Sequence, residues 1–264
     1  MRIMVGATRS LITGVTASVL LVTTAGCSTL ANYEAQQDKN ARTAQTHVQL
    51  GVGYLQQNKP EVALEKLKKA IEYDPDSAAA HSAIAMTYER LLKYEKADEH
   101  YREAIDLNPE DGGLYNNYGV FLCKQNRLDE AEEYFEKAVN TPLYKTPELA
   151  YENAGACAMR IPDQQKAESY LTKALKKNPQ LPVALINMAE IRFEQENYLS
   201  SRGFLQRFEA VSSHNAASLW LAIRIERKLG NDNAVATYSK QLQTQFPKSE
   251  QFKLMLNSLG ESQS

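Results

Sequence analysis

The sequence predicts an all-α fold built from repeated pairs of helices. Landmark residues recur at an interval of 34 residues, in the pairs Pro75 and Pro109, Ala63 and Ala97, Ala70 and Ala104, and Tyr54 and Tyr88. Four coincidences at one period indicate an internal repeat, and no strand-like alternation of apolar and polar residues is sustained along the chain. Of its 264 residues, 43% are hydrophobic, which is enough for a core that a repeat protein spreads along one axis.

A period of 34 residues is the length of the tetratricopeptide repeat, a unit of one helix, a turn and a second helix. Small residues lie where the two helices touch, and a proline ends the second helix. We therefore expect a right-handed superhelix of about six such repeats. Their predicted boundaries are 44–77, 78–111, 112–145, 148–181, 182–215 and 216–249.

Each of the first five predicted repeats carries a glycine or an alanine on its first helix, where a larger side chain would push the neighbouring helices apart. These residues are Gly51, Ala85, Gly119, Gly155 and Ala189. Between the third and fourth repeats a two-residue insertion shifts the phase, and the closing proline has moved to Pro142 and Pro147.

The last two repeats are degenerate. In the fifth, Ser201 and Phe208 replace the two alanines of the second helix, and Gly230 and Pro247 bracket the sixth. Terminal repeats are expected to be atypical because they end the stack. Apolar residues after Pro247 predict a short closing helix at 250–260, since the last repeat would otherwise expose an apolar face.

Residues 1–26 are predicted to be a signal peptide. Arg2 and Arg9 precede a charge-free run at 10–25. Its apolar part is too short for a transmembrane helix, which needs roughly 20 apolar residues. The run therefore indicates export rather than a membrane span.

The signal ends Thr24-Ala25-Gly26-Cys27, which resembles the lipobox of bacterial lipoproteins, although leucine is usual where Thr24 stands. This resemblance implies that Cys27 is acylated and becomes the new amino terminus. Ser28, which is not aspartate, implies sorting to the outer membrane in enterobacterial-type systems. The alternative is ordinary signal cleavage near Ala25, with Cys27 left as a spare thiol.

The segment 27–43 is polar and lacks apolar periodicity, so we expect a lipidated amino terminus followed by a flexible tether. Removal of 1–26, which contain two arginines and no acids, leaves 28 basic against 32 acidic residues and a net charge of −4. This mild acidity argues against a nucleic acid as partner, which would require a basic stripe.

The remaining cysteines, Cys123 and Cys157, are also 34 residues apart, each on the first helix of its predicted repeat. Successive first helices are neighbours, and an exported chain meets an oxidising compartment, so a disulfide between repeats three and four is one interpretation. Two thiols buried as small hydrophobic groups are the other, because the two-residue insertion places Cys157 slightly earlier in its repeat.

No pattern indicates catalysis, a cofactor or a metal site. His47, His81, His100 and His214 form no HExxH pair and no His/Cys cluster at metal spacing. A glycine-rich phosphate loop and a GxSxG motif are also absent from the sequence, and Cys123 has no histidine near it in sequence. We therefore expect a non-enzymatic protein.

A stack of this kind presents a concave surface lined by its first helices, on which an extended or helical peptide can lie. The repeat register places along this face Val48, Val52, Leu55, Met86, Asn116, Val120 and Cys123. The apolar members predict a hydrophobic groove, and the amide of Asn116 could hold a peptide backbone. Alternatively, Val52 and Leu55 pack against the next repeat, because inner-face and interface positions alternate within one helical turn.

Two segments, 50–91 and 114–139, resemble the type IV pilus biogenesis lipoprotein family called PilF or PilW. The run NNYGVFLC at 116–123 is the most specific part, and the resemblance covers nearly the whole mature chain. It implies a pilotin, a lipoprotein that binds subunits of the outer-membrane secretin and promotes their delivery and assembly. The resemblance also supports pairing of Cys123 with Cys157.

We accordingly expect a monomer that is anchored by lipid in the outer membrane and faces the periplasm. The alternative keeps the fold and changes the partner to another envelope machine, for outer-membrane protein insertion or peptidoglycan-synthase activation. A thiol-dependent enzymatic activity at Cys123 is a third possibility.

Overall fold

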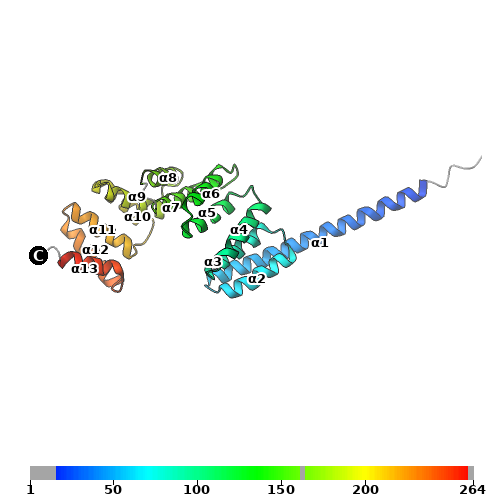
Figure 1. Ribbon diagram of the computed structural model, residues 1–264, viewed down its shortest axis with the longest axis horizontal. Coiled ribbons are helices and arrows are strands. Elements are labelled where there is room, and N and C mark those ends of the chain that lie inside the picture. Colours follow the sequence, from blue (N-terminus) through cyan, green and yellow to red (C-terminus); the bar gives the residue numbers. More distant parts are fainter. Residues whose placement is uncertain (1–15, 161–163, 261–264) are drawn as a thin grey trace, which may run out of the picture. The chain divides into compact units, whose positions relative to one another are not determined.

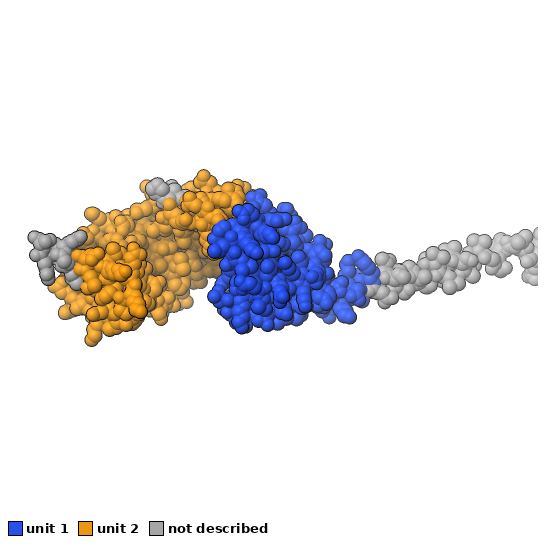
Figure 2. All heavy atoms as spheres, turned by 60° about the horizontal axis from the view of Figure 1, so that its bottom comes forward, with its two compact units in different colours: residues 1–107 blue, residues 108–264 orange. Residues whose placement is uncertain are grey.

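The computed structural model describes residues 16–160 and 164–260, with side chains from Tyr33 to Ser258. Within these ranges the chain forms thirteen α-helices joined by short connections, and no strand is present there (Figure 1). The helices divide into two compact units, unit 1 in residues 1–107 and unit 2 in residues 108–264 (Figure 2).

Unit 1 contains two helix pairs. Its helices are α1 (Thr16–Gln56), α2 (Pro60–Tyr73), α3 (Ala78–Arg90) and α4 (Tyr94–Leu107). Helix α1 packs along α2, and α3 packs along α4. Helix α3 also contacts both helices of the preceding pair, so two successive repeats share one core around Ala44, Ala70 and Ala80.

Unit 2 contains four helix pairs and a closing helix. Its helices are α5 (Gly112–Lys124), α6 (Leu128–Asn140), α7 (Pro147–Ala158), α8 (Gln164–Lys177), α9 (Pro182–Glu194), α10 (Tyr198–Glu209), α11 (Ala216–Lys228), α12 (Asp232–Gln245) and α13 (Glu250–Gly260). The first helices α5, α7, α9 and α11 contact one another in succession. With six helix pairs in the described part of the chain, the structure confirms the all-α tetratricopeptide-repeat prediction.

In three of the helix pairs the second helix lies directly against a glycine of the first helix. A β-carbon placed at Gly51 would lie 2.5 Å from Leu67 Cγ, and one at Gly119 would lie 2.8 Å from Phe135 Cε1. At Gly155 the same test gives 2.6 Å to Leu171 Cγ. Because these separations are well inside van der Waals contact, the first helices of repeats one, three and four can approach their partners this closely only because a glycine stands at this position.

The turn inside a repeat requires a left-handed residue. Positive φ angles occur among the described residues at Asn58, Leu92, Asn126, Glu196 and Gly230, and these positions keep the 34-residue interval from Asn58 to Asn126 and again from Glu196 to Gly230. Asparagine and glycine adopt this conformation readily, whereas leucine and glutamate do so at a steric cost.

The degenerate repeats keep the packing by other means. Ser201, which replaces an alanine, is fully buried, and its hydroxyl donates to the Ala189 carbonyl at 2.7 Å. Phe208 is buried in the core of unit 2. In α13, Met255 packs with Leu219, and the closing helix thereby covers apolar residues of α11 and α12.

The segment 27–43, for which we expect a flexible tether, is helical throughout as part of α1. It contains no proline or glycine after Gly26, and Ala, Gln, Lys and Arg are good helix formers. Local bonds add to this preference: Gln36 Nε2 donates to Asn40 Oδ1 and Gln37 Nε2 donates to Tyr33 Oη, both at 2.9 Å. A polar sequence without periodicity therefore excludes burial here but does not exclude a helix.

The predicted signal peptide at 1–26 and the predicted acylation of Cys27 lie largely outside the described residues. Residues 1–15 and the side chain of Cys27 are not among them. Among the helices that are described, none has both the length and the apolar character needed to cross a membrane.

Two glycines of unit 2 provide a matched test of the close-packing argument. Gly155→Ala is expected to destabilise the protein by about 1–3 kcal/mol, because the new methyl group displaces Leu171. Gly203→Ala, in α10, is expected to stabilise it by up to about 1 kcal/mol, because no atom lies within 4 Å and alanine favours the helix. Chemical denaturation followed by circular dichroism measures both, and equal effects of the two changes would contradict the argument.

Candidate functional site

The first helices of unit 1 place two of the predicted groove residues at the surface. Val52 on α1 and Met86 on α3 are 36% and 39% exposed. They occupy the same register position in successive repeats, on two helices that pack against each other. Val48 is half-buried and packs against the cluster of Ala44, Ala70 and Ala80. Unit 1 therefore presents a small apolar surface formed by Val52 and Met86, which we call the unit 1 apolar surface.

Leu55 does not belong to this surface. It is only 4% exposed, so its assignment to the groove is wrong, and the alternative that it packs inside the repeats holds. Leu55 follows Val52 by three residues, so the two side chains point about 60° apart around the helix axis. This angle is enough to place Val52 on the exposed face and Leu55 in the core.

In unit 2 the predicted residues Asn116 and Val120 lie half-buried on α5. The Nδ2 of Asn153, on α7, donates to Asn116 Oδ1 at 3.0 Å. One acceptor of the Asn116 amide is therefore used between repeats, while its own amino group stays available for a ligand in this part of the structure. Sequence reasoning missed Asn153, although it is an amide on the first helix of the following repeat.

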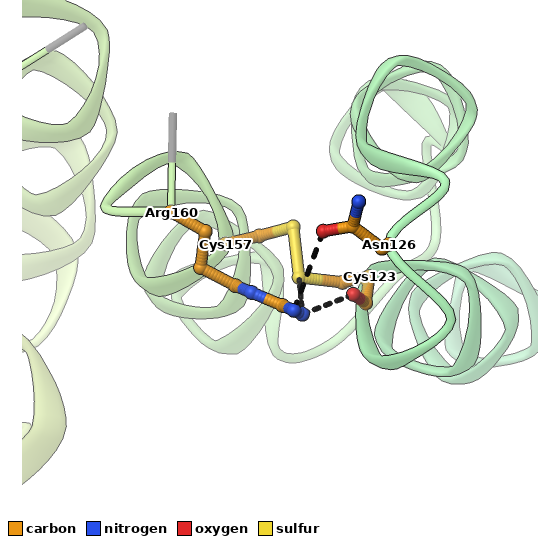
Figure 3. Close-up of a disulfide and its surroundings, with 4 residues drawn as sticks. All are labelled: Cys123, Asn126, Cys157 and Arg160. Carbon is orange, nitrogen blue, oxygen red and sulfur yellow. Dashed lines mark hydrogen bonds between the residues drawn. A yellow bond between two sulfur atoms is a disulfide. The ribbon is translucent and has the colours of Figure 1, made fainter. Parts of the chain in front are cut away.

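Cys123 and Cys157 join the same two helices. Their sulfur atoms form a disulfide, and their Cα atoms are 5.9 Å apart (Figure 3). Cys123, the last residue of the predicted inner face, therefore presents no free thiol. Beside the bridge, the guanidinium of Arg160 reaches back from the end of α7 and donates to the Cys123 carbonyl and to Asn126 Oδ1 (Figure 3). A cation at the carboxyl end of α5 complements the helix dipole and satisfies a terminal carbonyl group.

Glu152, also on α7, contacts the start of the following first helix, α9. Helix α9 begins at Pro182 after Leu181, whose side chain makes no capping bond. Instead, the buried carboxylate of Glu152 accepts from the Ala184 N–H at 2.8 Å and also from the Val183 N–H. Burial raises the pKa of this carboxyl above its ordinary value, while the two backbone donors lower it. An acidic residue of one repeat thus caps the first helix of the next.

A charged cluster covers the surface between α9 and α11. Arg224 lies 3.0 Å from Glu190 Oε1 and 2.9 Å from Glu194 Oε1, and its guanidinium carbon is 4.1 Å from the centroid of the Phe193 ring. This arrangement combines an ion pair with a cation–π contact. It makes the inner helices of repeats five and six polar, in contrast to the unit 1 apolar surface.

The polar contacts between repeats carry a weak sequence signal. Arg224 follows Glu190 by 34 residues, so the repeat period alone would have placed these two side chains on neighbouring helices. Asn153 follows Asn116 by 37 residues, and Glu152 precedes Ala184 by 32. The period does not predict these contacts, because each depends on how far one repeat is displaced relative to the next.

The histidines and acidic groups of the described residues form few clusters. No three His, Cys, Asp or Glu side chains gather there in a way that could hold a metal ion. The Nδ1 atoms of His81 and His100 are 3.1 Å apart, and burial together with His81 lowers the pKa of His100. His81 Nε2 also lies 3.1 Å from the Pro75 carbonyl oxygen. His81 therefore connects α3 both to α4, through His100, and to the segment that follows α2.

Comparisons with known proteins identify relatives over most of the chain. Residues 82–147 match the family described as tetratricopeptide repeat, and residues 51–91 match one described as TPR repeat. The type IV pilus assembly protein PilF of Pseudomonas aeruginosa is 32% identical over 236 residues, which are 89% of this chain and 94% of that protein.

Solved structures agree with this relationship. A structure of Pseudomonas aeruginosa PilF has a TM-score of 0.77 and 30% identity, and it covers 83% of this chain and 99% of its own. The crystal structure of PilW, described as a widely conserved type IV pilus biogenesis factor, has a TM-score of 0.73 and 31% identity, with coverage of 81% and 98%. The similarity therefore extends over nearly the full length of both relatives.

We predict that the bridge between Cys123 and Cys157 forms in the exported protein and stabilises unit 2. In a chain-entropy estimate, closing a loop of this length contributes ~3–4 kcal/mol. The double variant Cys123→Ser, Cys157→Ser should lose about this amount in urea denaturation, and reduction of the native protein should cause a similar loss. Alkylation of both thiols in native protein that has not been reduced would contradict the prediction.

Proposed function

This chain belongs to the PilF and PilW family of type IV pilus biogenesis proteins, and from this premise we propose that it acts as a pilotin. In this proposal it is a non-catalytic lipoprotein of the outer membrane that binds secretin subunits and promotes their delivery and multimerisation. The single observation that carries the proposal is the 32% identity to PilF over 89% of the chain. A role in type IV pilus biogenesis follows from the family, whereas secretin as the partner is the proposed step.

The unit 1 apolar surface is the proposed contact for the secretin. Val52 and Met86 are apolar side chains that remain more than one third exposed on adjacent first helices. An exposed pair of this kind can receive apolar side chains of a partner segment, and its burial would contribute to affinity. In unit 2, the amide of Asn116 is a second proposed contact for a peptide backbone.

The lipid anchor is the second part of the proposal. The lipobox-like segment ending at Cys27 supports acylation, and several acyl chains at about 0.8 kcal/mol per buried methylene would hold the protein firmly on a membrane. An anchor of this kind would bring the partner segment to the outer membrane without a spanning helix. Residue 27 would then be the first residue of the mature chain.

A different envelope machine remains the alternative partner, with the same anchor and the same repeats. The absence of enzymatic activity is also part of the proposal. It rests on the tetratricopeptide-repeat family to which the chain is similar and on the pilus assembly proteins among its relatives.

The contact surface is tested by the double variant Val52→Asp, Met86→Asp. Both changes place a charge on a side chain that the proposed partner would bury. We therefore expect recovery of the secretin from detergent-solubilised membranes to fall by at least about tenfold. Secretin multimers in the outer-membrane fraction should fall with it. The measurement is quantitative mass spectrometry of proteins that co-purify with the native and variant chains.

The matched control is Val183→Asp, Leu199→Asp, which places the same charges on exposed apolar residues of unit 2. It should leave secretin recovery unchanged. Equal loss in both variants would remove the unit 1 apolar surface from the proposal. Recovery of another envelope complex in place of the secretin would favour the alternative function.

The anchor is tested by Cys27→Ser, which removes the sulfur that acylation requires. We expect the protein to leave the outer-membrane fraction and its mass to lack the acyl chains, as measured by membrane fractionation and intact-mass spectrometry. The double variant Cys123→Ser, Cys157→Ser retains Cys27 and should stay in the membrane fraction. Outer-membrane retention of Cys27→Ser would overturn the lipid anchor.

A further inference from the structure

A hollow of about 660 Å³ lies in unit 2 between the start of α5, the end of α6 and the loop that follows α6. None of the residues assigned to the inner face lines it. Its apolar part is formed by Pro109, Tyr115, Pro142 and Leu143. The loop that follows α6, residues 141–146, contains Pro142, which departs from the position that the repeat pattern gives to the closing proline. It lies next to the two-residue insertion between repeats three and four. We call this hollow the α6–α7 hollow.

The walls of the α6–α7 hollow are fixed by internal contacts. Tyr144 is half-buried and packs on α5, because a β-carbon at Gly112 would lie 2.7 Å from Tyr144 Cβ. The Tyr144 N–H donates to the Thr141 carbonyl at 3.2 Å, and the Thr141 hydroxyl donates to the Lys137 carbonyl at 2.9 Å. Binding there would consequently require little ordering of the loop.

The opposite wall is held in a similar way. The Tyr115 hydroxyl donates to the Pro109 carbonyl at 2.9 Å, which ties α5 to the segment that precedes it. The Tyr115 ring also lies 6.2 Å from the Tyr134 ring, measured between centroids. Both walls are therefore shaped before any partner arrives, as is usual for binding hollows.

Leu143 is the most exposed large hydrophobic residue among the described side chains, at 83%. A single exposed leucine is common in soluble proteins. Here, however, Leu143 lines the hollow together with Pro109 and Pro142, and it neighbours Tyr144, which packs on α5. An exposed apolar side chain within an apolar lining is typical of a contact surface.

The lining of the hollow carries a net negative charge. Three carboxylates line the hollow, those of Glu110, Glu133 and Glu136, against the single cation Lys137. Lys137 lies 2.7 Å from Glu133 Oε1, and this pair neutralises itself. Glu136 accepts from the Tyr170 hydroxyl at 3.1 Å, a bond to a neutral donor that leaves its charge in place. Glu110 and Glu136 therefore give the hollow a net negative charge.

We propose that the α6–α7 hollow is a second docking site, which binds a segment of another protein carrying a bulky apolar side chain next to a lysine or an arginine. The apolar lining, which includes Leu143, receives the apolar side chain, and the carboxylates of Glu110 and Glu136 attract the cation. Nucleic acids and anionic lipids would be repelled by the same carboxylates. The site is separate from the unit 1 apolar surface, so this proposal does not depend on the secretin as partner.

The test is selection of a phage-displayed peptide library on the full-length mature protein, followed by fluorescence anisotropy with the enriched peptide. We expect enriched peptides to pair an apolar residue with a neighbouring lysine or arginine. Leu143→Asp should weaken the enriched peptide by about tenfold or more, because it places a charge against the apolar side chain. The double variant Glu110→Lys, Glu136→Lys should weaken it as well, and the native affinity should fall as salt rises.

The matched control is Leu199→Asp, since Leu199 is also an exposed leucine, at 70%, but lies on α10 outside the hollow. It should bind the peptide as the native protein does. Failure to enrich any peptide, enrichment of peptides without a basic residue, or unchanged binding by both hollow variants would overturn the proposal. Sedimentation showing a native dimer that Leu143→Asp dissociates would also overturn it, because a second copy would then be the occupant.

Discussion

The close approach of two helices at a glycine or an alanine is the constraint on which the first five repeats depend. At Gly51, Gly119 and Gly155 the second helix brings a leucine or phenylalanine against the backbone of the first, at distances that even a methyl group would violate. Once this contact is set, the remaining apolar residues of the pair form one face, and that face must be covered by the next pair. The 34-residue period is the sequence trace of this packing, and the left-handed turn residues follow it.

In unit 2, packing alone does not determine how one repeat sits on the next, because directional polar contacts add to it. Helix α7 is central to these contacts. At its end Arg160 donates to a terminal carbonyl of α5, and nearer its start Glu152 accepts from the first N–H groups of α9. Each side chain carries the charge that suits the helix end it meets. Together with the Cys123–Cys157 bridge, they define the spacing of the inner face around Asn116, where the repeat period was interrupted.

The fold could be predicted from the sequence because its determinants are local and periodic, whereas much of the candidate site could not. Leu55 and Val52 lie on neighbouring positions around the same helix, yet one is buried and the other exposed. The 34-residue repeat register does not resolve so small an angular difference, and it therefore places both residues in the groove. Glu152 and Arg160 act between repeats, so their roles depend on the displacement of neighbouring helices. The polar segment 27–43 predicts a flexible tether because it lacks apolar periodicity, yet its residues favour a helix without help from packing.

The helical course of 27–43 gives the amino-terminal segment a defined length. A flexible chain lets its two ends meet or separate freely, whereas an α-helix rises about 1.5 Å per residue. From Cys27 to Ala44, the first buried residue of unit 1, the helix therefore measures roughly 25 Å. A group attached at Cys27 would be held at that stand-off from the first repeat, and the segment would act as a ruler between a membrane surface and the repeats.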